Sequence, residues 1–212
     1  MQSDKKISTL QFITIDHPTI SHSEQAIRAY NAGCTWVQLR MKNASELEIE
    51  SEIYKILPTA LLHNATLLIN DNVGIAQKTK AHGVHLGKND MHPKDARQIL
   101  GDNVIIGGTA NTLEDVLTLI EADVDYIGLG PFRFTTTKKN LSPTLGLNGY
   151  ENIFNALKQK NINFPIVAIG GILENDIEAI RATGIHGIAL AGAIVADKNI
   201  EENIKLFLQK IL

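Results

Sequence analysis

The sequence predicts a (β/α)₈ TIM barrel that forms a single domain over residues 1–212. Short apolar runs rich in β-branched residues alternate with longer amphipathic runs along the whole chain, which is typical of parallel strands joined by helices. Eight such pairs favour a closed barrel over an open flavodoxin-like sheet, which needs fewer units. Several strand-like runs are apolar on both faces, as expected where helices cover the outside and side chains fill the inside.

The predicted strands are short apolar runs, and the predicted helices are the amphipathic runs that follow them. In chain order, the strands begin near Thr9, Trp36, Thr66, Gly83, Val104, Tyr126, Pro165 and Gly187. In the same order, the helices cover Ser23–Ala32, Ser45–Leu57, Val73–Thr79, Pro93–Leu100, Leu113–Ala122, Tyr150–Lys160, Asp176–Ala182 and Ile200–Leu212. Pro93 suits a first helical turn, and Thr112 and Asn175 are suitable N-caps.

Composition limits the kinds of partner that we expect. Charged residues make up 20% of the chain and the net charge is −3, which argues against a nucleic-acid or membrane-surface partner. An anion site must therefore be a local concentration of positive charge. The one cysteine, Cys34, is expected to be a buried structural thiol, which agrees with a cytoplasmic location. The N-terminus has no apolar signal core, and no run is long enough to span a membrane.

Polar side chains gather where the predicted strands end, which is where a barrel of this kind builds its active site. Along Val37–Lys42, side chains alternate between the two faces of the strand. Gln38, Arg40 and Lys42 therefore share one face, and the apolar residues between them share the other. We expect the polar set to point into the barrel mouth, where two cations and an amide suit a polyanion.

Two acids also follow strand ends. Asp71 ends the third strand-like run, and Asp90 follows the fourth. Converging carboxylates beside a cationic pocket make sense if a divalent ion lies between them and a diphosphate, because Mg²⁺ takes one or two carboxylates together with phosphate oxygens. The alternative is that each Asp only begins a turn or helix.

Two further features point to phosphate. The stretch Tyr126–Lys139 begins as a buried strand and ends in a loop of hydroxyl and ammonium groups, although a solvated connector would have the same composition. Glycines after the seventh and eighth strands, such as Gly171 and Gly192, let backbone N–H groups approach an anion, unless they serve only packing.

His82, His85 and His92 lack a zinc-binding spacing, and we interpret them as structural or supporting residues.

Five motifs carry a family resemblance, in this order along nearly the whole chain: VQLRMK (Val37–Lys42), IND (Ile69–Asp71), GVHLGKND (Gly83–Asp90), GPFRFTTTKK (Gly130–Lys139) and AIGGI (Ala168–Ile172). In order and spacing they resemble thiamine phosphate synthase. The resemblance implies a barrel that condenses 4-amino-5-hydroxymethyl-2-methylpyrimidine diphosphate with hydroxyethyl-methylthiazole phosphate. It implies thiamine monophosphate and pyrophosphate as products, a requirement for Mg²⁺, and a dissociative substitution.

The resemblance also implies roles for particular residues. The pyrimidine diphosphate would be held by Gln38, Leu39, Arg40, Met41, Lys42, Asn70, Thr109 and Lys138. The thiazole phosphate would be held by Thr135, Thr136, Thr137, Gly171, Ala191 and Gly192. Mg²⁺ would be bound by Asp71 and Asp90, and the catalytic groups would be Arg40, Lys42, Thr109 and Lys138.

Three positions depart from the family pattern. Gly192 and Thr109 stand where the family usually has serine, and Lys88 stands where it usually has glutamine. Gly192 removes a hydroxyl contact to the thiazole phosphate, and Lys88 adds a charge beside Asp90. We expect these changes to affect substrate affinity rather than the type of reaction.

Two other functions remain as alternatives. A thiazole tautomerase of the same family would tend to lose the metal-binding acids and the threonine-lysine loop, but this chain retains Asp71, Asp90, Thr137 and Lys138. A non-catalytic protein that binds thiamine precursors would not need two metal-binding acids. The sequence therefore favours the synthase, and it leaves the oligomeric state open.

Overall fold

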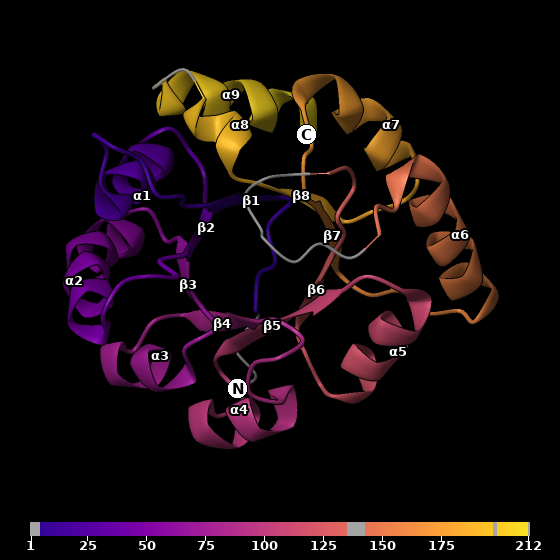
Figure 1. Ribbon diagram of the computed structural model, residues 1–212, viewed down its shortest axis with the longest axis horizontal. Helices are drawn as coiled ribbons and strands as arrows, with labels where there is room; N and C mark the ends of the chain where they lie inside the picture. Colours follow the sequence, from indigo (N-terminus) through magenta and orange to yellow (C-terminus); the bar gives the residue numbers. More distant parts are fainter. Residues whose placement is uncertain (1–4, 135–142, 197–198, 212) are drawn as a thin grey trace.

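The computed structural model describes residues 5–134, 143–196 and 199–211, and it contains a closed barrel of eight parallel strands surrounded by helices (Figure 1). The predicted fold class is confirmed. The strands are β1 (Leu10–Ile13), β2 (Trp36–Leu39), β3 (Thr66–Asn70), β4 (Gly83–Leu86), β5 (Ile105–Ala110), β6 (Tyr126–Leu129), β7 (Ile166–Ile169) and β8 (Gly187–Leu190). Each pairs with the next, and β1 pairs with β8 to close the ring.

Helices follow the strands and form the outer layer. They are α1 (His22–Asn31), α2 (Glu46–Leu62), α3 (Val73–Thr79), α4 (Pro93–Leu100), α5 (Leu113–Glu121), α6 (Gly146–Gln159), the 3₁₀ turn η1 (Glu174–Asp176), α7 (Ile177–Ala182), α8 (Gly192–Val195) and α9 (Ile200–Ile211). Thr112 caps α5 as predicted. Asn175 does not cap α7, because it lies inside η1. None of the described helices is long and apolar enough to cross a membrane.

Two predicted helix boundaries were wrong, and one short helix was missed. α2 continues five residues beyond Leu57, through Pro58, because Pro58 lies on the exposed side of the helix, where a carbonyl that loses its partner can meet water. α6 begins at Gly146 rather than Tyr150. Its start is fixed by backbone hydrogen bonds from Leu145 to Pro131 and from Gly146 to Phe132, not by a capping side chain. The four-residue α8 was not predicted.

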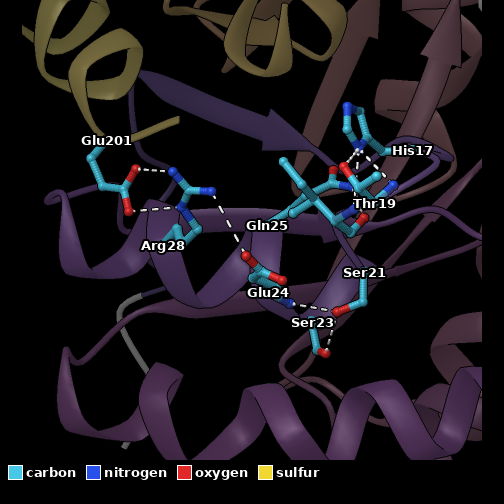
Figure 2. A network of polar contacts seen from close by, with 9 residues as sticks. His17, Thr19, Ser21, Ser23, Glu24, Gln25, Arg28 and Glu201 are labelled. Carbon is cyan, nitrogen blue, oxygen red and sulfur yellow. Dashed lines mark hydrogen bonds and ion pairs between the residues drawn. The ribbon is translucent and has the colours of Figure 1, made fainter. Parts of the chain in front are cut away.

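The first and last helices are joined at the point where the ring closes. Arg28 of α1 donates two hydrogen bonds of 2.7 Å to the carboxylate of Glu201 of α9 (Figure 2). The segment between β1 and α1 is fixed by Gln25, which accepts from the Ile15 N–H and donates to the Ile15 and Ile20 carbonyls. The connection that follows β1 at the barrel mouth is therefore held by side-chain contacts.

Apolar side chains fall into two clusters. The larger one lies between the barrel and its helices, and includes the outward residues Val37 and Leu39 of β2. The smaller one fills the barrel interior and consists of Ile13, Trp36, Leu68, Ile105, Tyr126, Val167 and Ala189. The predicted alternation along β2 therefore holds.

Candidate active site

The floor of the candidate site is an amide pair on β2 and β3. Gln38 is 2% exposed, and its Nε2 donates a 2.8 Å hydrogen bond to Oδ1 of Asn70. The buried Oε1 of Gln38 has no hydrogen-bond partner among the described residues. A buried acceptor without a partner is costly, so this atom is suited to receive a donor from a ligand.

Two acids and a cation meet beside this pair. The Nζ of Lys42 lies 3.2 Å from Oδ2 of Asp71, and the carboxylates of Asp71 and Asp90 lie within hydrogen-bonding reach of each other. The Gly87 N–H holds Asp90 in place with a 2.7 Å hydrogen bond. Burial raises the pKa of Asp71, and Asp90 raises it further, against the opposing effect of Lys42. The structure therefore brings together both predicted metal ligands.

Asp71 and Arg40 are positioned by the strand ends. Asp71 has a left-handed backbone, with φ of 64°, and its N–H donates to the carbonyl of His85 at 2.9 Å. The Arg40 N–H donates to the Thr14 hydroxyl at 3.0 Å. Burial lowers the pKa of the Arg40 guanidinium, while the charges of Asp71 and Asp16 raise it. Arg40 is thus a half-buried cation in the field of two carboxylates.

Thr109 lies on the inward face of β5, beside a buried polar chain. Nε2 of His85 lies 2.9 Å from the Thr109 hydroxyl, and Nδ1 of His85 lies 2.7 Å from the Tyr126 hydroxyl. Nε2 of Gln11 donates to the Tyr126 hydroxyl at 3.0 Å. Sequence reasoning gave Gln11 and the Tyr126 hydroxyl no role. The available signal was a glutamine in the middle of a largely apolar strand-like run.

The loop after β6 is clamped to the end of β7. Arg133 donates 2.7 and 2.9 Å hydrogen bonds to the two carboxylate oxygens of Asp176, and a 2.8 Å bond to the carbonyl of Gly171. Gly170 and Gly171 both have positive φ, and a Cβ at Gly171 would lie 2.7 Å from the Arg133 side chain. A packing role for these glycines is therefore present in the structure. Arg133, which sequence reasoning left unassigned, fixes the start of the loop.

The remaining predicted contacts are only partly described. Ala191 and Gly192 lie where β8 passes into α8, and a Cβ at Gly192 would meet nothing within 4 Å. Leu39 packs in the outer core and Met41 packs against it, so they contribute backbone rather than side chains to the mouth. The loop residues Thr135, Thr136, Thr137 and Lys138 lie outside the described residues.

Other residues singled out from the sequence have structural contacts. Lys88 forms a 2.6 Å ion pair with Asp115, so its added charge is balanced away from Asp90. The His82 ring accepts from the Leu67 N–H, and His92 caps α4. Cys34 is buried, and burial raises its pKa to about 11, as expected of an inert structural thiol.

Comparisons with known proteins show the family to which the chain is similar. The family model described as thiamine monophosphate synthase matches residues 10–194. The chain is 52% identical over 187 residues to a thiamine-phosphate synthase of Bacteroides thetaiotaomicron, covering 88% of this chain and 90% of that protein. It is 50% identical over 199 residues to one from Bacteroides fragilis, covering 93% and 98%. The solved thiamine phosphate pyrophosphorylase of Pyrococcus furiosus superposes with a TM-score of 0.84 at 28% identity, covering 96% and 95%.

Proposed function

The chain belongs to the thiamine monophosphate synthase family of transferases, and we propose that it condenses 4-amino-5-hydroxymethyl-2-methylpyrimidine diphosphate with hydroxyethyl-methylthiazole phosphate. The products are thiamine monophosphate and pyrophosphate. The observation that carries the proposal is the meeting of Lys42, Asp71 and Asp90 at the ends of neighbouring strands. A cation beside a close pair of acids is suited to a metal-bound diphosphate and has no obvious purpose in a packing site.

The amide pair supports recognition of the aminopyrimidine. An aminopyrimidine edge presents an amine donor next to a ring-nitrogen acceptor. The unpartnered Oε1 of Gln38 suits the donor, and the amide nitrogen of Asn70, whose oxygen is already engaged by Gln38, suits the acceptor. The two amides fix each other's orientation, so the pair presents one pattern of donor and acceptor.

The residues present also fit Mg²⁺. Asp71 and Asp90 supply two carboxylates whose mutual repulsion contributes to the raised pKa of Asp71, and an ion between them would relieve it. Among the described residues no third His, Cys, Asp or Glu joins them, and Mg²⁺ characteristically leaves positions for water and phosphate oxygens. When bound, Mg²⁺ would supply positive charge to the diphosphate.

The reaction needs charge stabilisation rather than a protein nucleophile. The bond between the pyrimidine methylene carbon and the diphosphate oxygen breaks, and its electron pair leaves with the pyrophosphate. The electron-rich aminopyrimidine carries the methylene cation, which the thiazole nitrogen then captures. We propose that Arg40, Lys42 and Lys138 stabilise the departing charge. The ion pair of Lys42 with Asp71 and the half-buried charge of Arg40 support this assignment.

We propose that the thiazole phosphate binds across the ends of β6, β7 and β8. Thr135, Thr136 and Thr137 would supply hydroxyl groups, and Gly171, Ala191 and Gly192 would supply backbone groups. The clamp of Arg133 on Gly171 and Asp176 supports this assignment, because it holds the start of the threonine loop beside β7. We also propose a single domain and a cytoplasmic location, which the single buried cysteine supports.

The test is to mix the purified protein with both substrates, with and without Mg²⁺, and to measure thiamine monophosphate. We expect Mg²⁺-dependent product, and a loss of at least about 100-fold in turnover for Asp71→Ala and for Lys138→Ala. Asp102→Ala, which removes an exposed carboxylate just before β5, is the matched control and should retain full turnover. Near wild-type turnover in both active-site variants would contradict the proposed mechanism. Isomerisation of the thiazole without coupling to the pyrimidine would indicate a tautomerase.

A further inference from the structure

A chain of buried hydrogen bonds crosses the barrel interior from β1 to β5. It runs from Gln11 through Tyr126 and His85 to Thr109, over contacts of 3.0, 2.7 and 2.9 Å. Gln11 is 1% exposed and Tyr126 is fully buried, whereas Thr109 is half-buried at the mouth. A polar chain of this depth is costly in an apolar interior unless every member is satisfied.

Two glycines make room for this series of hydrogen-bonded side chains. Strand register places His85 beside Gly107 and Gly107 beside Tyr126, so the missing side chain on β5 lets the two rings meet. A Cβ at Gly107 would lie 2.2 Å from the Tyr126 ring. The register also places Gly128 beside Thr109, and a Cβ at Gly128 would lie 3.2 Å from the His85 ring. The strands are therefore shaped around the contacts.

The hydrogen bonds of this series all run in one direction, from donor to acceptor. The Gln11 amide donates to the Tyr126 oxygen, and burial raises the pKa of Tyr126 far above its ordinary value, so the phenol keeps its proton. Within the described residues, the other polar partner of that phenol is Nδ1 of His85, which must therefore accept a hydrogen bond from the hydroxyl. Because Nδ1 is an acceptor, the ring proton of His85 lies on Nε2, which donates a hydrogen bond to the Thr109 oxygen.

The Thr109 hydroxyl is thereby left with a proton to donate. Its described polar contact is the one to His85, where it acts as acceptor. We infer that Gln11, Tyr126 and His85 are positioning residues that orient Thr109 as a hydrogen-bond donor to the pyrimidine diphosphate. The inference rests on the proposed function, because it assigns the network to one of the two proposed substrates.

Steady-state kinetics with each substrate varied in turn tests the inference. Tyr126→Phe keeps the ring against Trp36 but breaks the chain, and we expect kcat/KM for the pyrimidine diphosphate to fall about tenfold, with KM for the thiazole phosphate unchanged. Tyr30→Phe is the matched control. It removes another buried tyrosine hydroxyl, which donates to the Thr66 carbonyl at the start of β3, away from the mouth.

A double-mutant comparison separates positioning from general damage. Thr109→Val should produce at least the same loss, and Thr109→Ser should lose less than Thr109→Val because it keeps the hydroxyl. Tyr126→Phe should add nothing further in the Thr109→Val background. Losses that multiply, or a Tyr126→Phe enzyme that matches Tyr30→Phe in both kcat/KM values, would overturn the inference. Thermal unfolding of every variant shows whether a loss of activity is a loss of fold.

Nitrogen NMR on protein with labelled histidine gives a readout that does not depend on activity. We expect His85 as the neutral tautomer with its proton on Nε2, assigned by comparison with His85→Gln. A proton on Nδ1 would reverse the chain and overturn the inference. Wild-type protein that makes no thiamine monophosphate would instead overturn the proposed function and the assignment to its substrate, while the tautomer would still decide the direction of the chain.

Discussion

Gly107→Ala is the change that most directly probes how the barrel interior is built. An alanine Cβ at this position would lie 2.2 Å from Cε1 and Cζ of Tyr126 and 2.6 Å from its hydroxyl. Tyr126 has little room to retreat, because its ring packs edge-on against Trp36 with centroids 4.7 Å apart. Overpacking of this kind costs about 1–3 kcal/mol, and the stiffer unfolded chain of alanine offsets about 0.4–1 kcal/mol of that.

We therefore expect Gly107→Ala to lower the free energy of unfolding by about 1–2 kcal/mol. For a chain of this size the melting temperature should fall by roughly 2–4 °C for each kcal/mol. Thiamine monophosphate formation should also fall, because the contact between Tyr126 and His85 is pushed apart. Urea denaturation measures the first effect, and the coupled assay with both substrates measures the second.

Gly108→Ala is the matched control from the same strand. Its Cβ would point outward and lie 2.6 Å from the end of the Leu119 side chain of α5, which can rotate away. We expect this variant to lose less than about 1 kcal/mol of stability and to keep its activity. Equal stability and activity of Gly107→Ala and Gly108→Ala would refute the predicted clash, because the interior would then have space that the structure does not show.

Three further outcomes follow from the site. Gly192→Ser enters open space and returns a hydroxyl, so KM for the thiazole phosphate should fall about tenfold while Gly192→Ala leaves it unchanged; steady-state kinetics decides. Arg133→Ala releases the loop from Asp176, so KM for the thiazole phosphate should rise about tenfold with KM for the pyrimidine diphosphate unaltered; equal rises in both would contradict a local clamp. Without Mg²⁺, the pKa of Asp71 is higher in the folded state than in the unfolded state, so protonation of Asp71 stabilises the folded state. The free energy of unfolding, compared with that of Asp71→Asn, should therefore decline as pH rises through the folded-state pKa. Urea midpoints across pH should show this decline, and added Mg²⁺ should abolish it; a flat difference would refute the carboxylate pair.

The fold followed from the sequence because its signals are local. Each strand is marked in the sequence by an apolar run, and eight alternations of strand and helix are compatible with few topologies. The predicted start of α6 was wrong because the contacts that fix it come from residues distant in the sequence. α6 begins at Gly146 because the backbone of Pro131 and Phe132 receives its first N–H groups, and no capping residue near Gly146 carries that information. Pro58 stops a helix in principle, but its exposed position in α2 removes most of the penalty.

The candidate site was partly predictable for a similar reason. Lys42, Asp71 and Asp90 follow strand ends, and parallel strands bring their ends to one edge, so their meeting could be foreseen. The pairing of Lys88 with Asp115 could not, because it depends on where the loop after β4 lies against the start of α5. A charge that looked like a neighbour of Asp90 in the sequence is balanced elsewhere in space.

The polar chain inside the barrel depends on register, which a single sequence does not reveal. A glycine within a strand indicates a close approach but not by what. At Gly107 the approaching group is the Tyr126 ring, because β4, β5 and β6 are aligned so that His85, Gly107 and Tyr126 share one level. A shift of one residue along β5 would place either Ile106 or Gly108 at this level, and it would turn Thr109 to the outer face of the barrel. The position and hydrogen bonding of the Thr109 hydroxyl thus depend on strand alignment as much as on the residues themselves.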